Sequence, residues 1–307
     1  MSSKTMKAAR MHDYGAADQL KVEEAPQPEP KAGEVLVRLK AAGVNPADWK
    51  YRSGAYKAYV PLNFPWTPGL EGAGVVEAVG ADVNSFKPGD AVFGPINGTY
   101  AEYTVAPAGE LALKPAALSF EEAASVPVGA LTAWGAVEAA SIKPGQRVFV
   151  QGAAGGVGLF AAQLARAKGA QVIGTSSAVN LDFVRSLGVE AIDYDAAPFE
   201  TVVHAVDIVI DTVGGEVLQR SWDVLKPGGL LVSVAGRATE EEAKAKGKQF
   251  KGAARAPASN LVQIAELISA GKLTPAIQAG FPLSEAAAAM QLCETGHGRG
   301  RIILHIN

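Results

Sequence analysis

The sequence predicts an α/β protein whose first third is rich in β-strands and whose middle forms a doubly wound parallel sheet. Two observations support this class. Before Ser119, short apolar runs that alternate or nearly alternate are separated by proline and glycine, as in strands joined by turns. From Arg147 onward, strand-like and helix-like runs follow one another, and this rhythm indicates parallel strands with right-handed crossovers.

The β-rich part contains no segment with a helical period before Ser119. Ser119 then changes the pattern, because a serine followed closely by two glutamates is typical of the start of a helix. Lys87-Pro-Gly-Asp90 is expected to form a turn that leads into a strand. The expected strands of this part cover residues 34–41, 73–80, 91–93 and 99–105.

Beyond Arg147 the expected elements alternate. Helices are expected at residues 157–168, 178–187 and 215–225. Strands are expected at residues 147–152, 171–175, 190–194, 207–213 and 229–235. The highly charged stretch 239–248 is expected to be a surface helix or a mobile segment, residues 258–271 form an amphipathic pattern, and residues 301–306 are the last expected strand.

The composition is that of a globular protein. Of the 307 residues, 48% are hydrophobic and 19% are charged, so we expect a large core and little disorder. The net charge of −3 argues against a nucleic-acid partner held by phosphate contacts. The N-terminal residues lack the apolar core of a signal peptide, and no apolar run is long enough to span a bilayer. We therefore expect a soluble, cytoplasmic protein with no membrane partner.

Cys293 is the single cysteine, so no internal disulfide and no cysteine cluster for structural zinc can form. It lies in the apolar, helix-like run 286–293. We interpret it as a small buried hydrophobic residue rather than a nucleophile.

A glycine-rich turn, Gly152-Ala-Ala-Gly-Gly-Val-Gly158, joins a strand to a helix former. In the spacing G-x-G-x-x-G, Ala153 takes the first glycine position, and Gly155 and Gly158 take the second and third. Such a turn lets backbone N–H groups approach a pyrophosphate at a helix N-terminus. We predict that Gly152, Ala153, Gly155, Gly156, Val157 and Gly158 bind a dinucleotide; the alternative is a purely structural turn.

The end of the next strand indicates which dinucleotide binds. An NAD site usually has an acidic residue there, which holds the 2′-hydroxyl of the ribose. Here Thr175, Ser176 and Ser177 occupy the region, and hydroxyls can donate to a 2′-phosphate. We therefore predict NADPH, with Ser176 and Asn180 at the phosphate and Tyr194 over the adenosine. Against this stands the absence of Arg or Lys at the turn, and Ser176 is equally suited to capping a helix.

Several motifs occur in the order typical of one family: Gly43-Val-Asn-Pro-Ala-Asp48, Arg52-Ser-Gly54, Thr67-Pro-Gly-Leu-Glu-Gly-Ala-Gly-Val-Val76, the glycine turn, Leu225-Lys-Pro-Gly-Gly229 and Gly300-Arg-Ile-Ile-Leu304. The chain resembles the zinc-independent quinone oxidoreductase and enone reductase branch of the medium-chain dehydrogenase/reductase superfamily. The resemblance implies a GroES-like domain at 1–120, a Rossmann NADP-binding domain at 121–257 and a return to the first domain at 258–307. It also implies NADPH-dependent reduction of quinones or α,β-unsaturated carbonyls, and a homodimer.

The zinc-containing members of this superfamily serve as a contrast. Asn45 stands at the position of a zinc-binding cysteine, and Leu70 stands at that of a histidine. With Cys293 the single cysteine, the soft ligands of a catalytic zinc are missing. We therefore expect no metal, and a zinc alcohol dehydrogenase is a poor interpretation.

The resemblance also implies roles for individual side chains. Lys50 is expected to hold the substrate carbonyl, and Tyr56 is expected to line the substrate pocket as a donor or proton relay. Asn45 and Asp48 are expected beside the nicotinamide ribose, with Thr132 near the nicotinamide. The plainer alternatives are a solvated side chain for Lys50, aromatic packing for Tyr56, turn chemistry for Asn45 and Asp48, and a helix cap for Thr132.

A second class of function stays open at this point. The chain could be a non-catalytic NADPH-binding protein, such as a redox sensor or a structural protein that kept the fold. The sequence does not distinguish one-electron from two-electron quinone reduction, and it names no dedicated proton donor.

Overall fold

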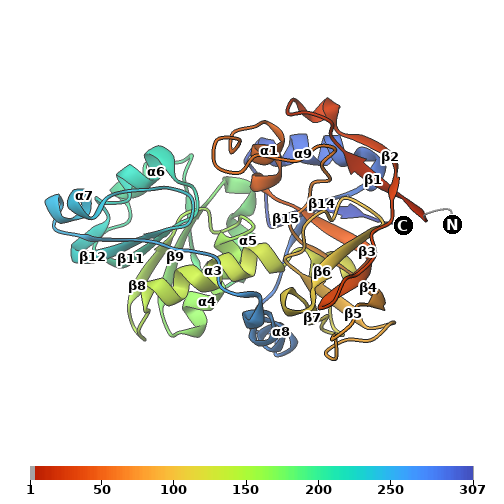
Figure 1. Ribbon diagram of the computed structural model, residues 1–307. Coiled ribbons are helices and arrows are strands. Elements are labelled where there is room, and N and C mark those ends of the chain that lie inside the picture. The colour runs from red at the N-terminus through yellow and green to blue at the C-terminus, as the bar shows by residue number, and fades with distance from the viewer. Residues whose placement is uncertain (1–3, 307) are drawn as a thin grey trace. The chain divides into compact units, whose positions relative to one another are not determined.

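The structure, a computed structural model, describes residues 4–306. By its internal contacts the chain divides into two units (Figure 1). Unit 1 comprises Met1–Val128, Ala258–Ser269 and Ala276–Asn307, and unit 2 comprises Gly129–Pro257 and Ala270–Pro275.

Unit 1 is built around β3 (Glu34–Val44), a long strand with antiparallel neighbours on both sides. Its sheet runs in the order β14-β15-β3-β4-β5-β7, and β6 also pairs with β3. The strands are β4 (Gly72–Val79), β5 (Ala91–Gly94), β6 (Tyr103–Pro107), β7 (Ala112–Leu113), β14 (Ile277–Pro282) and β15 (Arg301–His305). A separate antiparallel ribbon consists of β1 (Thr5–Arg10) and β2 (Lys21–Pro26).

The core of unit 1 follows from the alternation along β3. Val35, Val37 and Leu39 are buried together with apolar side chains of neighbouring elements. The helix predicted after Ser119 is α2 (Phe120–Ala124), and the Ser119 hydroxyl accepts a hydrogen bond from the Glu122 N–H at its start. Two further helices of this unit are α8 (Leu261–Ser269) and α9 (Ala286–Glu294), of which α9 contains Cys293 as expected.

Two predictions for the first third were wrong. Helix α1 (Pro46–Arg52) lies in the region predicted to contain no helix. It is too short to show a period, although proline at its first position is a start signal. The strand predicted at 99–105 begins at Tyr103 as β6. Tyr100 lies outside the strand, where its N–H donates to Pro68 O and its carbonyl accepts from the Ala9 N–H of β1.

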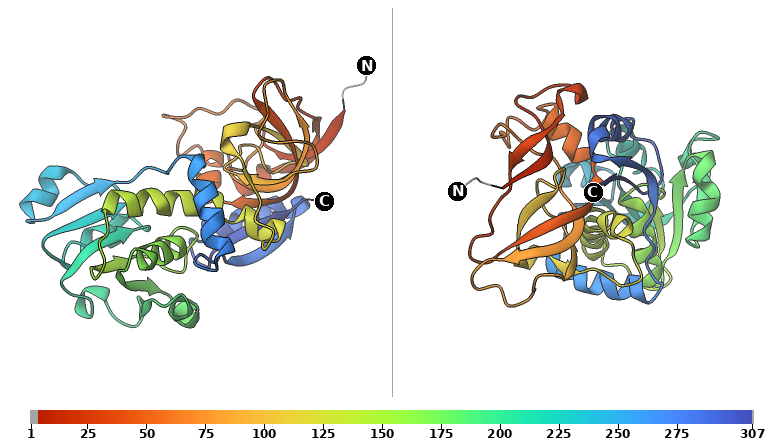
Figure 2. Two further views of the ribbon diagram at one scale, coloured as in Figure 1. Left: turned by 90° about the horizontal axis from the view of Figure 1, so that it is seen from below. Right: turned by 90° about the vertical axis from the view of Figure 1, so that its right-hand side faces the viewer.

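Unit 2 has a parallel sheet in the order β10-β9-β8-β11-β12-β13. Its strands are β8 (Arg147–Val150), β9 (Gln171–Ser176), β10 (Glu190–Asp193), β11 (Val206–Asp211), β12 (Leu225–Ser233) and β13 (Gln249–Gly252). Its helices are α4 (Gly158–Ala167), α5 (Leu181–Ser186), α6 (Gly215–Arg220) and α7 (Glu240–Ala245), and α3 (Pro127–Ala140) leads into the unit. Helix α4 packs on β8 and β9, and α5 packs on β9 and β10 (Figure 2). The predicted fold class, a parallel α/β sheet plus a β-rich part, is confirmed.

The boundaries differ from the prediction where turns were mistaken for element ends. Helix α6 ends at Arg220, and β12 already begins at Leu225, because Lys226-Pro-Gly-Gly229 forms an irregularity inside the strand, with Gly228 at φ +72°, rather than a turn before it. The edge strand β13 was not predicted, since it is short and polar. The charged stretch 239–248 contains the short helix α7, capped by Thr239.

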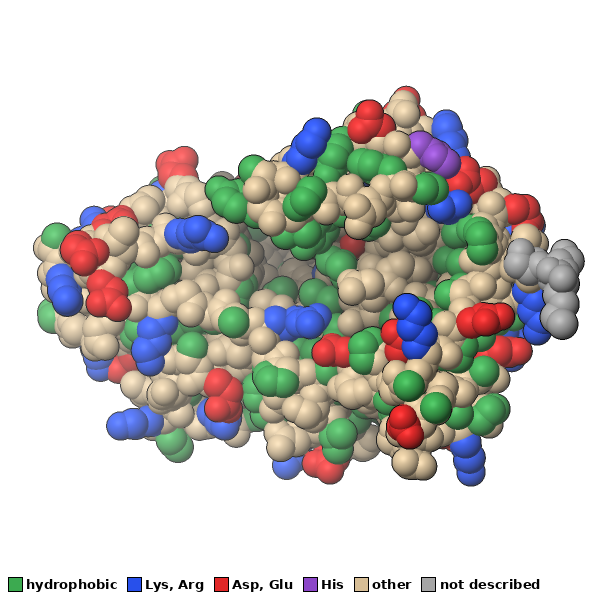
Figure 3. All heavy atoms as spheres, in the orientation of Figure 1, with side chains coloured by type: hydrophobic (Ala, Val, Ile, Leu, Met, Phe, Trp, Pro, Cys, Tyr) green, Lys and Arg blue, Asp and Glu red, His purple; other side chains and the backbone are tan. Residues whose placement is uncertain are grey.

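Among residues 4–306, no helix is long and apolar enough to cross a membrane. On the face that Figure 3 shows, acidic and basic side chains are interspersed, in keeping with a net charge of only −3.

Candidate functional site

Asn45, Glu71 and Arg301 meet because their strands are neighbours in the unit 1 sheet. Asn45 directly follows β3, Glu71 directly precedes β4, and Arg301 begins β15. The antiparallel register pairs Val44 with Ile302 on one side of β3 and Ala42 with Gly72 on the other. The sheet therefore brings three polar residues, distant in the chain, to one end of its central strand.

These three residues form a buried ion pair with an amide beside it. Glu71 Oε1 lies 2.9 Å from Arg301 Nε and accepts a hydrogen bond of 2.9 Å from Asn45 Nδ2. Glu71 Oε2 accepts from the Val128 N–H at 2.7 Å. The Arg301 Nε–H is not aligned for a hydrogen bond despite the short distance, and Arg301 Nη2 has no partner among the described residues. A buried guanidinium with unused donors is suited to holding an anionic oxygen.

Asp48 lies one helical turn beyond Asn45, in α1. Its Oδ2 accepts hydrogen bonds from the Asn45 N–H at 2.8 Å and from the Tyr100 hydroxyl at 3.1 Å. Its Oδ1 is buried and has no partner within residues 4–306. Because the side chain is 0% exposed, desolvation raises the pKa of Asp48 to about 7, and the two hydrogen bonds offset only part of this.

Lys50, the predicted carbonyl-binding residue, lies in α1 with Asp48. It is half-buried, and its ammonium lies 5.6 Å from the centre of the Trp49 ring. Helix α1 thus joins Asp48, Lys50 and the cap residue Asn45 in one short segment. A cation beside an aromatic face is held without being neutralised, so it stays available to an incoming oxygen.

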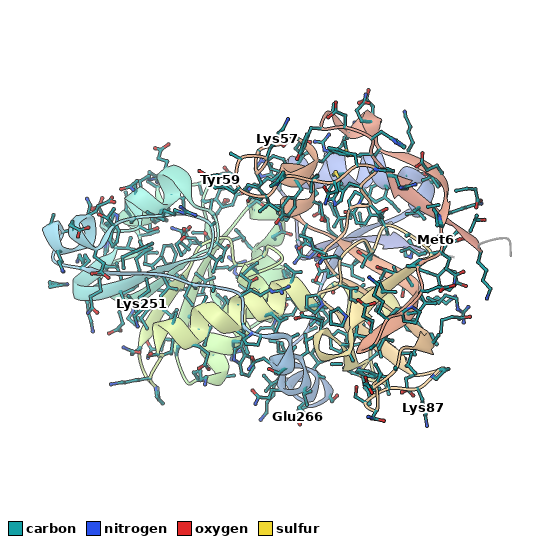
Figure 4. The ribbon with its side chains drawn as sticks, in the orientation of Figure 1. Met6, Lys57, Tyr59, Lys87, Lys251 and Glu266 are labelled. Carbon is teal, nitrogen blue, oxygen red and sulfur yellow. The ribbon has the colours of Figure 1, made fainter. Side chains whose placement is uncertain are left out.

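Tyr56 lies beyond α1, in a loop rich in aromatic residues. Its ring packs edge-on against Tyr51 with centroids 5.2 Å apart. In the same loop Tyr59 is 85% exposed, and Lys57 lies over the ring of Tyr14 (Figure 4). The packing alternative for Tyr56 is therefore realised in part, while its predicted donor role stays a prediction.

Helix α1 is anchored to α9 by an ion pair. The Arg52 guanidinium, 3% exposed, lies 2.7 Å from Glu294 Oε2. Next to this carboxylate in sequence, Cys293 is partly buried against the core of unit 1, and desolvation raises the pKa of its thiol to about 12. A thiol in this state is a poor nucleophile, in agreement with its interpretation as a hydrophobic residue.

In unit 2 the glycine turn lies between β8 and α4, as predicted. Gly152 has φ +69°, a conformation that favours glycine. A Cβ at Gly158 would lie 2.0 Å from Gly152 O, so the last glycine is required by close packing inside the turn. A Cβ at Gly155 would meet that oxygen only at 3.3 Å. The turn leads into a ten-residue helix, and a helix N-terminus carries partial positive charge, so these residues fit a pyrophosphate.

A buried hydrogen-bond chain holds the start of this turn. The Thr175 hydroxyl accepts from the Gly152 N–H at 2.9 Å and donates to Gln151 Oε1 at 2.8 Å. The amide of Gln151 in turn donates to the Ser221 hydroxyl at 3.1 Å. A Cβ at Gly174 would lie 2.5 Å from the Ala153 methyl, so glycine on β9 leaves room for an alanine at the first glycine position.

Three residues predicted at the adenosine lie together at the carboxyl ends of β9 and β10. Ser176 O accepts from the Tyr194 N–H at 3.2 Å. The Ser176 hydroxyl is buried and donates to Ser177 O, while Asn180 Nδ2 donates to the Ser177 hydroxyl. Tyr194 is 41% exposed and is free to stack on a base. Thr132, half-buried in α3, lies outside this group.

Sequence reasoning did not assign a role to four of the residues that build these sites. Glu71 and Arg301 stood inside recognised motifs but were not chosen, because only the sheet register shows that they meet. From the sequence, Tyr100 is expected inside a strand and Gln151 near the end of one. Among residues 4–306 there is no group of three or more His, Cys, Asp or Glu side chains that could hold a metal.

Comparison with known proteins agrees with both units. A family described as "Alcohol dehydrogenase GroES-like domain" matches residues 31–116, and one described as "Zinc-binding dehydrogenase" matches residues 187–304. The 2-methylene-furan-3-one reductase of Solanum lycopersicum is 36% identical over 98% of this chain and 79% of its own length. The chloroplastic NADPH-dependent alkenal/one oxidoreductase of Arabidopsis thaliana is 34% identical over 98% of this chain and 80% of its own length.

A solved structure extends the comparison to three dimensions. The quinone oxidoreductase of Coxiella burnetii superimposes with a TM-score of 0.91 at 37% identity, covering 99% of this chain and 100% of that protein. Identity and coverage at this level, together with the two units and the glycine turn, leave one assignment. The chain belongs to the medium-chain dehydrogenase/reductase superfamily, in its quinone oxidoreductase and enone reductase branch, and is an oxidoreductase.

Proposed function

We propose that this protein uses NADPH to reduce quinones or the C=C bond of α,β-unsaturated carbonyl compounds, by hydride transfer and without a metal. The observation that carries the proposal is the position of Lys50 in the short helix that also contains Asp48. Lys50 is half-buried and has no carboxylate partner among residues 4–306. The names of the relatives, which include an alkenal/one oxidoreductase and a quinone oxidoreductase, support the same substrate classes.

Lys50 is proposed to stabilise the charge that the reaction creates. The bound nicotinamide supplies a hydride to the β-carbon of the enone, which leaves negative charge on the carbonyl oxygen. An ammonium donates a charge-assisted hydrogen bond to that oxygen, and such a bond strengthens as the charge develops. A proton from water then completes the saturated carbonyl at the α-carbon. In a quinone, the same donor serves one of the two oxygens.

The cofactor is proposed to bind at the glycine turn of unit 2. Backbone N–H groups of residues 156–158 would hold the pyrophosphate, and Tyr194 would cover the adenosine. NADPH is supported by the absence of an acidic residue at the end of β9, where Ser176 stands, and by the name of the relative from Arabidopsis thaliana. Asn45, Asp48 and Thr132 are proposed to orient the nicotinamide end.

Independence from zinc is proposed on the chemistry of the side chains. The Asn45 amide is a weak metal ligand and already donates to Glu71, and Leu70 offers no donor atom. The same network neutralises Glu71 through Arg301. Residues 1–120 and 258–307 are proposed to carry the substrate chemistry and residues 121–257 the cofactor. A cytoplasmic homodimer is proposed in line with the family.

Lys50→Met tests the proposal, with Lys57→Met as the matched control. Both lysines lie near aromatic rings, but Lys57 is exposed and lies over Tyr14 in the following loop. Stopped-flow mixing of the NADPH complex with a panel of enones and quinones measures the hydride step. We expect Lys50→Met to slow that step by about 100-fold, as for loss of one oxyanion donor, with NADPH affinity unchanged. Lys57→Met should react like the wild type.

An unchanged rate in Lys50→Met would remove this residue from the mechanism. If the wild-type NADPH complex reacts with no member of the panel, the chain is instead a dinucleotide-binding protein without turnover, such as a redox sensor.

A further inference from the structure

We propose that NADH is a second hydride donor for this protein, and that Asp193 and Asp195 hold its preference for NADPH below about tenfold. The proposal rests on the proposed function, because it concerns the adenosine end of the same dinucleotide site. In sheets of this kind the adenosine ribose lies at the carboxyl end of the second strand, here β9. The two cofactors differ only in the 2′-phosphate at that ribose.

The hydroxyl groups at the end of β9 are largely engaged within the chain. The Thr175 hydroxyl donates to Gln151, and the buried Ser176 hydroxyl donates to Ser177 O. The Ser177 hydroxyl accepts from Asn180 and keeps its own hydrogen. One neutral hydroxyl is thus available for a phosphate dianion, which offers several strong acceptor oxygens.

The cations that a 2′-phosphate requires are scarce in this part of the chain. Between Lys168 and Arg220 the sequence contains a single Lys or Arg, Arg185. Arg185 is exposed and lies 2.9 Å from Asp182 Oδ1, one turn earlier in the same helix. Arg166 donates to Leu187 O, near the opposite end of β10, and Arg220 binds both oxygens of Glu200.

Carboxylates, rather than cations, lie at the ends of β9 and β10. In the parallel register Asp193 is paired with Ser176, so it ends β10 beside the end of β9. Its Oδ1 accepts from the Asp195 N–H at 3.0 Å, which holds the carboxylate at the strand end. Asp195 is exposed, and Tyr194 between the two acids is bonded through its N–H to Ser176 O. Two negative charges therefore flank the residue expected to cover the adenosine.

These charges affect the two cofactors differently. A carboxylate repels a 2′-phosphate of charge about −2, and this repulsion lowers the affinity for NADPH most at low salt. A free 2′-hydroxyl is not repelled and can donate to a carboxylate. At the end of β9, Ser176 stands where an NAD site has an acidic residue, so the repulsion of a 2′-phosphate from that strand is absent. Asp193, at the end of the neighbouring strand, repels the 2′-phosphate instead.

The test uses 2′,5′-ADP and 5′-ADP, which represent the adenosine halves of NADPH and NADH, and isothermal titration calorimetry on the full chain. For the wild type we expect the two affinities to lie within about tenfold of each other. In the double variant Asp193→Asn/Asp195→Asn, 2′,5′-ADP should bind about tenfold more tightly, with 5′-ADP little changed. Glu190→Gln removes the same charge from the other end of β10 and should leave the ratio unaltered.

A wild-type preference for 2′,5′-ADP above about 100-fold, or an unaltered ratio in the double variant, would overturn the proposal. Reduction of enones with NADPH but not with NADH would do the same while leaving the proposed function intact. If neither fragment nor either intact cofactor binds, the dinucleotide site itself is wrong, and both proposals fail together.

Discussion

The titration of Asp48 makes the stability of the wild-type protein depend on pH in an unusual direction. Burial raises the pKa of Asp48 from its ordinary value of 3.8 to about 7, so the folded state binds this proton more tightly than the unfolded chain does. Stability contributed by the protonated group is therefore present in acid and is lost as the pH rises toward 7. Most buried carboxylates that accept hydrogen bonds behave in the opposite way, because their pKa is lowered.

Replacing Asp48 with asparagine isolates this effect. The amide oxygen can keep the hydrogen bonds from the Asn45 N–H and Tyr100, and the amide nitrogen takes the place of Oδ1, which has no partner among the described residues. Any cost of burying that nitrogen does not depend on pH. At ~1.4 kcal/mol for each pH unit, the wild type should lose about 3 kcal/mol relative to Asp48→Asn between about pH 5 and pH 8.5.

Urea unfolding of both proteins at several pH values measures this difference, and groups other than residue 48 cancel in the subtraction. Asp182→Asn serves as the control for loss of a carboxylate at the protein surface, since its side chain is 97% exposed. A difference between Asp48→Asn and the wild type that stays constant within about 0.5 kcal/mol over this range would refute a raised pKa for Asp48.

Two further predictions concern packing. Glu294→Gln removes the charge that faces the buried Arg52, and it should lower the free energy of unfolding, measured in urea, by about 2 kcal/mol. The control Glu285→Gln, at an exposed residue, should change the free energy of unfolding by less than about 0.5 kcal/mol. Equal effects would show that the ion pair does not anchor α1. Gly158→Ala should lower the free energy of unfolding by about 3 kcal/mol or prevent folding, because its Cβ would lie 2.0 Å from Gly152 O. Gly155→Ala should fold and lose dinucleotide affinity. If the two variants unfold alike, the close packing inferred for the turn is wrong.

Local patterns accounted for much of unit 2. The strand that enters the turn, the turn spacing and helix α4 all depend on residues within a few positions of one another, and each was predicted from the sequence. Helix α1 shows where this reasoning stops: it is a single short helix without a full apolar stripe, and its place is set by the Arg52–Glu294 ion pair with a distant helix. The start of β6 likewise depends on the contacts of Tyr100 with β1 and with the loop at Pro68.

Part of each candidate site could likewise be predicted from the sequence, and part could not. That Lys50, Asn45 and Asp48 belong together followed from their spacing and from the resemblance. The engagement of Thr175 and Ser176 within the chain did not follow, because a hydroxyl reads alike in sequence whether it faces a ligand or its own backbone.

By itself the sequence determined the α/β class, the glycine turn and the absence of a soft zinc ligand set, because periodicity, turn chemistry and residue identity are local properties. Tertiary structure alone decided that Glu71 and Arg301 meet Asn45, and that Asp193 stands beside Ser176. Both pairings depend on strand order and register, which are set by how whole sheets bury their apolar faces, and no window of the sequence contains that information.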